Sequence, residues 1–175
     1  GMSRKIRHLF NACSRSECYP TYVPFDVCDD VMIKSGAELS EKYSWLDVAP
    51  LSGDYTAGLG NIPVDSGKNL LMFLGGPIGN FTQEQGIAFL REVRELMSSS
   101  DQLLLGADRV KQPEILHAAY NDVAGITAEF NLNLLDVLNR ELGANFDRSK
   151  FEHYAFYNPE QNQIEMHLVC MDDQD

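Results

Sequence analysis

Two aspartates that each follow a predicted strand are the first candidates for a binding site. Asp26 ends the apolar segment Tyr19–Val27, and Asp54 follows the short strand predicted at Trp45–Leu51. A carboxylate at a strand end can accept both hydroxyl hydrogens of a ribose diol, and a second one beside it can accept from an adenine amino group. Each also has an ordinary alternative, Asp26 as a helix cap and Asp54 as a turn residue. The presence of both aspartates favours a nucleoside-binding site more than either residue does alone.

A glycine-rich turn supplies the next candidates. Gly75 begins the run GGPIGNF after a buried strand, where a residue without a side chain lets the backbone approach a ligand closely. Asn80 offers both a donor and an acceptor. A strand-to-helix turn that needs positive φ explains the glycines but not Asn80. Tyr120 ends a predicted helix, where its phenol can reach the same edge, although packing is the usual role of a half-buried tyrosine.

Alternating strands and helices position these residues. Apolar runs predict parallel strands near residues 20–26, 46–51, 69–74 and 102–107, and apolar spacing predicts helices at Ser3–Ala12, from Asp29 or Asp30 to Tyr43, and from the capping box of Thr82 and Gln85 to Ser99. This order is typical of an open α/β sheet, in which ligands bind beyond the carboxyl ends of the strands. Asp26, Asp54, Gly75 and Asp108 all fall at those ends.

The second half of the chain begins with helices and ends with a hairpin. We predict helices at Glu114–Tyr120 and Val123–Leu142, the second with an apolar stripe that steps by four residues. Residues 151–158 and 163–171 alternate in polarity and predict an antiparallel hairpin, followed by a frayed acidic tail. The stripe consists of Ile126, Phe130, Leu134 and Leu138.

Composition narrows the classes of partner. The 175 residues include 14 Lys and Arg against 26 Asp and Glu, for a net charge of −12. Such a field repels polyanions, which argues against nucleic acid and anionic membranes as partners. The chain has no apolar run of the ~20 residues that span a bilayer and no apolar leader, so we expect a cytoplasmic protein. Neither the four cysteines nor the four histidines have metal-ligand spacing, so no metal is expected.

Three long motifs make the chain recognisable: FLGGPIGNFTQEQ, the run from LLLGADRVKQPEILHAAY to ELGANFD, and HYAFYNPEQNQIEMHLV. They resemble the histidine-specific, S-adenosylmethionine-dependent methyltransferase family, known for the histidine trimethylation of ergothioneine biosynthesis. The resemblance implies a Rossmann-like methyltransferase fold, with a parallel sheet and a C-terminal antiparallel hairpin. It also implies an N-methyltransferase whose methyl donor is S-adenosylmethionine and whose substrate is the α-amino group of histidine or a related amino acid.

The resemblance also implies roles for individual residues. The donor would be bound through its carboxylate, ribose and adenine by Lys5, Asp26 and Asp54, in that order. Gly75, Asn80 and Tyr120 would line the amino-acid pocket, with Asn80 and Tyr120 holding the α-amino and carboxylate groups. Methyl transfer to an amine needs a neutral amine, good positioning and exclusion of water more than a strong base.

Compared with the family pattern, the chain lacks two parts. The first strand of the sheet, with its glycine-rich donor loop, would precede Ser3, and further substrate-pocket residues would follow Val169. We therefore expect a partial α/β core at 3–110, a helical part of the substrate lobe at 111–147, and a hairpin that completes the sheet at 148–171.

Two functions remain open at this point: a methyltransferase with impaired activity, or a truncated, non-catalytic relative that acts as a binding module. Without the first strand, the strands at Tyr22 and Leu71 each have an open edge, and open edges tend to pair with other strands. The two edges could pair with each other or with a second copy of the chain. We expect the second, a homodimer.

Overall fold

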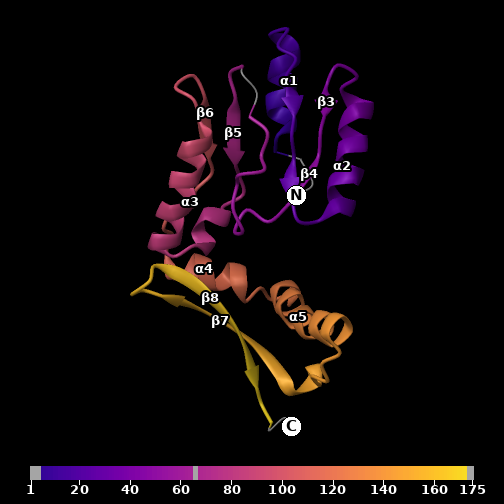
Figure 1. Cartoon of the computed structure of the whole chain (residues 1–175). Helices are drawn as coiled ribbons and strands as arrows, with labels where there is room; N and C mark the ends of the chain where they lie inside the picture. Colours follow the sequence, from indigo (N-terminus) through magenta and orange to yellow (C-terminus); the bar gives the residue numbers. More distant parts are fainter. Residues whose placement is uncertain (1–4, 65–66, 173–175) are drawn as a thin grey trace. The chain divides into compact units, whose positions relative to one another are not determined.

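The computed structural model describes residues 5–64 and 67–172. The chain divides into two units, Gly1–Gly106 and Ala107–Asp175, which are described separately. Figure 1 shows the elements of each. The predicted helix start at Ser3, the N-terminal Gly1 and Met2, and most of the acidic tail lie outside the described residues. The first unit contains α1 (Arg7–Arg15), β1 (Thr21–Tyr22), β2 (Phe25–Asp26), α2 (Asp29–Lys42), β3 (Asp47–Val48), β4 (Leu51–Ser52), β5 (Leu70–Phe73), the 3-10 helix η1 (Pro77–Asn80), α3 (Gln83–Leu96) and β6 (Gln102–Leu105).

The first predicted strand pair forms, but each strand is interrupted. β1 pairs in parallel with β3, and β2 pairs in parallel with β4. Pro24 lies between β1 and β2, and since proline has no N–H, one hydrogen bond of the ladder cannot form there. Its carbonyl oxygen still accepts from the N–H of Leu51 at 2.9 Å, so the two strands stay aligned across the break.

Helices α1 and α2 share an apolar cluster with this pair. Ile6 and Phe10 from the α1 region meet Leu39 of α2 and Tyr43, the residue after α2; Leu39 has no exposed surface. The hydroxyl of Tyr43 donates to the Asn11 side chain at 2.7 Å, so a buried phenol keeps a polar partner. Asp29 and Asp30, the expected caps of α2, instead lie in its first turn; Cys28 precedes the helix without a side-chain cap.

The second predicted pair forms without interruption. β5 and β6 pair in parallel from Leu70 opposite Gln102 to Phe73 opposite Leu105. Helix α3 begins at the predicted capping box: the Thr82 hydroxyl accepts from the Gln85 N–H, and the Gln85 side chain accepts from the Thr82 N–H. The helix ends at Leu96, a little before the predicted Ser99, and it packs on this pair through Phe89 and Val93.

The expected single sheet is divided. Among the described residues, no ladder hydrogen bonds join the β1–β4 strands to β5, so the two predicted open edges do not close on each other. Apolar side chains connect the pairs instead: Met72 of β5 packs on the cluster of α1 and α2, and Phe25 of β2 packs on the cluster of α3. The unit is therefore joined by packing where a central strand would give hydrogen bonds.

The second unit is a hairpin with two helices on it. The hairpin register runs from Phe151 opposite Cys170 to Asn158 opposite Gln163, as the alternation predicts, and α4 and α5 contact β7. Among the described residues, β7 pairs in antiparallel fashion with β8. That this hairpin completes the sheet stays a prediction. The three-segment division of the chain stays a prediction. The elements are α4 (Pro113–Tyr120), α5 (Ile126–Leu142), η2 (Arg148–Lys150), β7 (Phe151–Asn158) and β8 (Gln163–Cys170).

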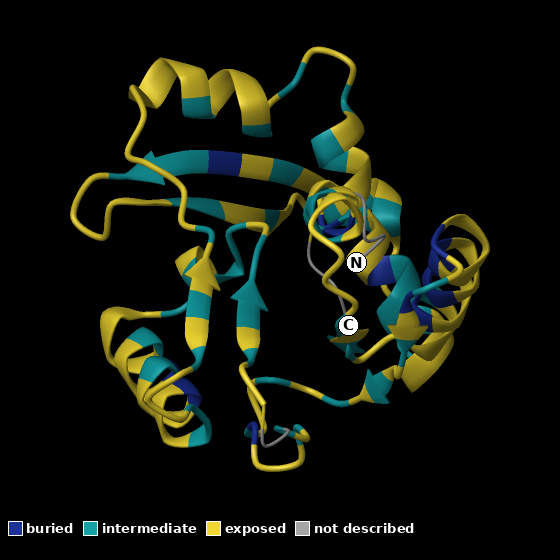
Figure 2. Cartoon of the chain, turned by 90° about the horizontal axis from the view of Figure 1, so that it is seen from above, coloured by how far each residue is buried: buried dark blue, intermediate teal, exposed yellow. Residues whose placement is uncertain are grey.

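Most of the apolar stripe of α5 is exposed, contrary to the ordinary expectation for such a stripe; Leu138 alone of its four residues is partly buried. Ile126 and Phe130 are each 71% exposed, and the buried residue of the helix is Leu135. Figure 2 shows how few positions are fully buried. No helix among the described residues is long and apolar enough to cross a bilayer. The cytoplasmic location stays a prediction.

Candidate functional site

The structure brings Asp26 and Asp54 to neighbouring positions at the carboxyl ends of paired strands. Asp26 is the last residue of β2 and lies opposite Ser52, the last residue of β4. The N–H of Gly53 donates to the carbonyl oxygen of Asp26 at 3.0 Å, and Asp54 follows directly. The parallel register of the two strands therefore places both carboxylates at one edge of the pair.

Local hydrogen bonds orient both carboxylates. Oδ1 of Asp26 accepts from the N–H of Cys28 at 3.1 Å. Oδ1 of Asp54 accepts from both the hydroxyl and the N–H of Thr56, each at 2.7 Å. These bonds, led by that from the hydroxyl, lower the pKa of Asp54, so this exposed carboxylate is ionised at neutral pH. Asp54 therefore does act as a turn residue, and the same hydrogen bonds keep its negatively charged carboxylate at the edge.

Gly75 lies at the carboxyl end of β5 with an exposed amine beside it. Its φ is +111° and that of Gly76 is +89°, values that side chains rarely tolerate. Lys5 Nζ is 3.9 Å from the position that a β-carbon on Gly75 would take. The amine and the bare backbone are therefore adjacent, although Lys5 is far from Gly75 in sequence. Asn80 ends η1 with an exposed side chain.

An aromatic cluster supports this edge. Phe25 precedes Asp26, Tyr55 follows Asp54, and Phe81 follows Asn80. All three pack against the buried cluster that contains Phe89. The rings of Tyr55 and Phe81 lie 6.0 Å apart, and those of Phe81 and Phe89 lie 5.4 Å apart. Each candidate polar residue thus has an aromatic neighbour in the sequence that is anchored in one shared core.

Gly53 is a residue that sequence reasoning missed. A β-carbon built on it would lie 2.4 Å from Cε2 of Phe25, closer than any real contact. Only glycine therefore allows the Phe25 ring to pack beside the backbone that leads to Asp54. The sequence shows a glycine directly before Asp54. The reason that a glycine is needed there is the Phe25 ring, which lies on β2 and cannot be placed beside Gly53 from sequence alone.

The remaining candidates belong to the second unit. Tyr120 is the last residue of α4 and is partly buried. Asp108 accepts from the Lys111 ammonium and from the N–H of Arg109, and the lysine bond, as the larger influence, lowers the pKa of Asp108. Neither residue is placed relative to the edge of the first unit. The pairing of Tyr120 with Asn80 stays a prediction.

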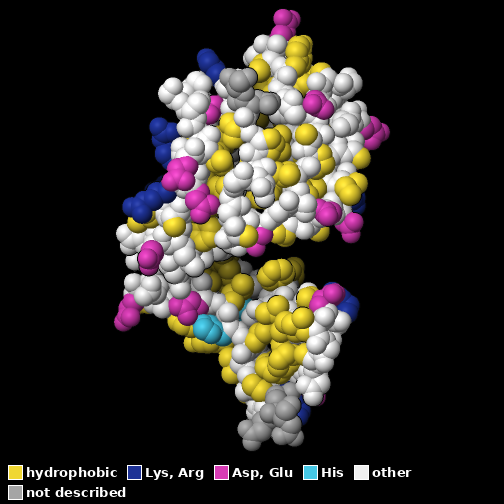
Figure 3. Space-filling model, in the orientation of Figure 1, with side chains coloured by type: hydrophobic (Ala, Val, Ile, Leu, Met, Phe, Trp, Pro, Cys, Tyr) yellow, Lys and Arg dark blue, Asp and Glu magenta, His cyan; other side chains and the backbone are white. Residues whose placement is uncertain are grey.

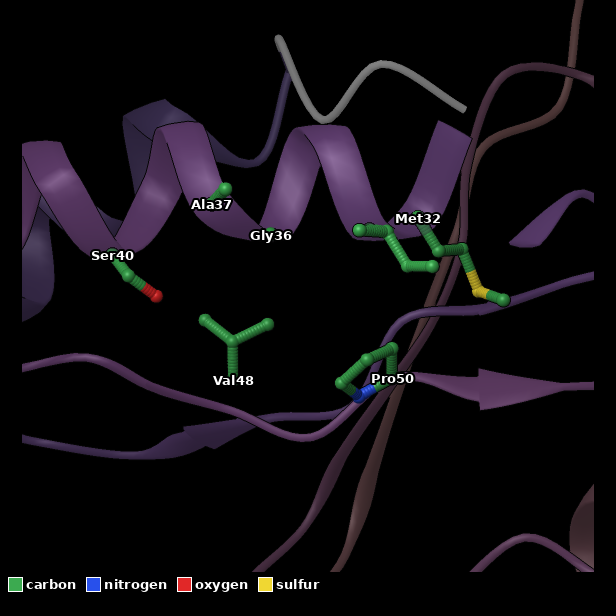
Figure 4. Close-up of a pocket in the computed structure, with 7 residues that line it drawn as sticks. Met32, Gly36, Ala37, Ser40, Val48 and Pro50 are labelled. Carbon is green, nitrogen blue, oxygen red and sulfur yellow. The ribbon is translucent and has the colours of Figure 1, made fainter. Parts of the chain in front are cut away.

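A surface pocket lies elsewhere in the first unit. It has a volume of about 250 Å³ and lies between α2 and the β3–β4 segment (Figure 4). Its lining is apolar apart from Ser40, and it includes none of the predicted site residues. It offers no charged group to a nucleoside or an amino acid. The lining residues are Met32, Ile33, Gly36, Ala37, Ser40, Val48 and Pro50.

The chemistry of the edge fits S-adenosylmethionine better than a metal. Two carboxylates can accept from hydroxyl and amino hydrogens, and the Lys5 amine can pair with a carboxylate. A β-carbon on Gly76 would meet nothing within 4 Å, so the backbone there is open to a ligand. Across residues 5–64 and 67–172, no group of three His, Cys, Asp or Glu side chains could hold a metal ion.

The surface of each unit has its own character. Figure 3 shows Asp and Glu side chains scattered over the first unit, and hydrophobic side chains gathered on the visible face of the second. The exposed apolar residues of the second unit include Val123, Ile126, Phe130 and Leu134. The acidic surface agrees with a partner that is not a polyanion.

Comparison with known proteins identifies the class. The sequence matches the histidine-specific, S-adenosylmethionine-dependent methyltransferase family over residues 1–175, and the chain belongs to that family. It is 41% identical over 168 residues to the histidine N-alpha-methyltransferase of Mycolicibacterium smegmatis, covering 96% of this chain and 52% of that protein. The Mycobacterium tuberculosis histidine N-alpha-methyltransferase is 39% identical with the same coverage. The chain thus spans about half the length of these relatives.

A more distant relative is named for ergothioneine biosynthesis. Ergothioneine biosynthesis protein 1 of Neurospora crassa is 26% identical in an alignment 183 positions long, which covers 95% of this chain and 21% of that protein. S-Adenosylmethionine is the methyl donor of the family, as its description states.

Proposed function

We propose that this chain acts as an S-adenosylmethionine-dependent N-methyltransferase on the α-amino group of histidine or a related amino acid. We also propose that its strands belong to a Rossmann-like sheet. Two mycobacterial relatives named for this activity support the substrate class. The observation that carries the proposal is that Asp26 and Asp54 lie at one edge. The N–H of Gly53, the residue before Asp54, donates to the carbonyl oxygen of Asp26 there.

Each residue has a defined task in this proposal. Asp26 accepts from the ribose hydroxyls, Asp54 accepts from the adenine amino group, and Lys5 pairs with the carboxylate of the donor. When bound, the donor supplies a methyl group attached to a positively charged sulfur. On transfer of the methyl group, the rest of the donor leaves with that sulfur as a neutral thioether. Gly75 lets the backbone approach, while Asn80 and Tyr120 hold the amino acid so that its neutral amine faces the methyl carbon. Positioning of this kind is the main contribution of the protein.

A calorimetric titration with S-adenosylmethionine tests the donor site. Asp26→Ala should weaken binding by about tenfold or more, since it removes the two hydrogen bonds expected to the ribose, each worth ~0.5–1.5 kcal/mol. Asp54→Ala should weaken it less, because one adenine contact is lost. Asp47→Ala is the matched control, as Asp47 is an exposed aspartate at the start of β3. Binding that is indifferent to Asp26→Ala would place the donor elsewhere.

A methylation assay across the twenty amino acids tests the substrate. Transfer to histidine or a close relative should fall in Asn80→Ala and in Tyr120→Phe. Robust transfer to RNA, or histidine methylation unaffected by both substitutions, would overturn the assignment.

A second candidate function is a non-catalytic binding module that pairs through its open strand edges. The observation that favours it is the absence of ladder hydrogen bonds between β2 and β5 in the described residues. Such edges pair readily, and a homodimer is the proposed product. Scattering mass across a concentration series is the measurement, and a chain that stays monomeric at high concentration would contradict the dimer. Donor binding without any transfer would favour this second function.

A further inference from the structure

A run of hydrogen bonds in the second unit connects Tyr120 to a histidine that has no role in the function so far. His153 lies on β7 and is partly buried. Its Nε2 is 2.9 Å from the carbonyl oxygen of Tyr120, and its Nδ1 is 3.0 Å from Nδ2 of Asn131 on α5. The same Nδ2 of Asn131 is 2.9 Å from the carbonyl oxygen of His167 on β8. Four elements are joined by three bonds.

The two carbonyl groups determine the direction of every bond. A carbonyl oxygen only accepts, so Nε2 of His153 must carry a hydrogen and donate it to Tyr120. For the same reason, Asn131 must present its amide nitrogen to His167, and its second hydrogen points to Nδ1 of His153. Turning the Asn131 amide over would set its oxygen against the His167 oxygen. The network therefore requires a neutral His153 with its hydrogen on Nε2.

The bond from His153 falls at a position where helix α4 needs one. Tyr120 is the last residue of α4, and the final carbonyl groups of a helix have no partner within it. The next residue, Asn121, donates from its side chain to the carbonyl oxygen of Ala155 at 3.0 Å. The last turn of α4 is thus attached to β7 at two successive residues. The backbone of Tyr120 cannot rotate without breaking the His153 bond.

We propose that neutral His153 is a positioning residue for the amino-acid substrate, acting through Tyr120. By holding the Tyr120 carbonyl, it sets the direction in which the phenol leaves the helix, and so the affinity for the amino acid. This inference rests on the proposed function, because it takes Tyr120 as a substrate-binding residue. Asn131 supports the imidazole and selects its tautomer.

Four variants test the proposal by histidine titration of the donor-saturated chain. His153→Phe keeps a ring of similar size but removes both hydrogen bonds, and it should weaken histidine binding by about tenfold. His153→Gln keeps a donor that can reach the Tyr120 carbonyl and should restore most of the affinity. Donor affinity should be unchanged in both. His167→Phe is the matched control, because the His167 ring stacks on Phe156 outside the network and its carbonyl is retained. Tyr120→Phe measures the contribution of the phenol itself.

The outcomes separate the inference from the function. If the wild-type chain binds no amino acid, or Tyr120→Phe has no effect, the proposed function fails and the inference fails with it. If binding depends on Tyr120 but His153→Phe has no effect, the inference alone is overturned. Nitrogen NMR of the imidazole gives a reading without substrate: hydrogen on Nε2 is expected, and hydrogen on Nδ1 would overturn the network. If His153→Phe does not fold, Asn131→Leu serves in its place. It removes the hydrogen bond from Asn131 to Nδ1 of His153 and should also weaken histidine binding.

Discussion

The edge of the first unit and the end of α4 in the second unit hold their candidate residues by different forces. At the edge, aromatic rings beside Asp26, Asp54 and Asn80 pack against the cluster that contains Phe89. At the end of α4, hydrogen bonds fix the backbone around Tyr120. The His153 side chain donates to the Tyr120 carbonyl oxygen, and the Asn121 side chain donates to the Ala155 carbonyl oxygen. Packing is non-directional and tolerates small shifts, whereas hydrogen bonds set an angle. The first arrangement fixes where a residue lies, and the second fixes how it points.

The largest effect is expected from the centre of the aromatic cluster. Phe89→Ala should lower the free energy of unfolding by about 3–5 kcal/mol, because a large buried side chain leaves a cavity. Phe130→Ala, the same change at a 71% exposed residue, should cost less than about 0.5 kcal/mol. Urea unfolding followed by circular dichroism measures both. Equal losses would mean that the α5 stripe is buried in solution, in contradiction to the structure.

A smaller effect is expected where packing reaches the donor site. Gly53→Ala should cost about 1–3 kcal/mol, since its β-carbon would overlap the Phe25 ring and force the ring to move. Because Gly53 links Asp26 to Asp54, donor affinity should also fall. Gly60→Ala is the control, as a β-carbon there meets nothing within 4 Å. Thermal unfolding and calorimetric titration are the measurements. A Gly53→Ala variant with wild-type stability and affinity would show that the edge tolerates displacement.

Acid should weaken the first unit through Asp101. Its carboxylate accepts from the N–H of Asn69 and from the N–H of Ser98, each at 2.7 Å, and these bonds lower its pKa from 3.8 to about 2. A pKa lowered by folding means stability that is present above pH 3.8 and lost as the pH falls through about 2.

Asp101→Asn removes this dependence. The difference in melting temperature between wild type and Asp101→Asn should be largest near neutral pH and should shrink as the pH falls toward 2. Asp47→Asn keeps the Asp101 bonds and should follow the wild-type curve. A difference that stays constant with pH would mean that the Asp101 carboxylate does not hold β5 to the end of α3.

The smallest effect on stability is expected at Asn80. Its side chain is exposed, so Asn80→Ala should change the free energy of unfolding by less than about 0.5 kcal/mol. The same variant should weaken amino-acid binding, because it removes a donor and an acceptor from the proposed pocket. Asn61→Ala, at an exposed asparagine of the preceding loop, is the control for both measurements. A large loss of stability in Asn80→Ala would assign Asn80 to the fold and not to the pocket.

Much of the local structure was predictable from sequence because it depends on near neighbours. The capping box at Thr82 and Gln85 forms as predicted, and so does the antiparallel hairpin. β2 ends at Asp26, as predicted, and β5 ends at Phe73, two residues before Gly75. The prediction that Asp29 or Asp30 caps α2 was wrong, but only locally. Both acids favour a helix start, and α2 begins at Asp29 itself, so both lie in its first turn.

Contacts between distant segments were not predictable in this way. The sequence by itself determined the order of the strands and helices, the capping box that starts α3, and the family, because these follow from spacing and long motifs. Only the tertiary structure decided that β2 and β5 share no hydrogen bonds and that Phe130 is exposed. It alone also decided that Gly53 must be glycine and that His153 reaches Tyr120. The reason is physical: a local rule concerns residues within a few positions, while packing and cross-element hydrogen bonds depend on which segments the folded chain brings together.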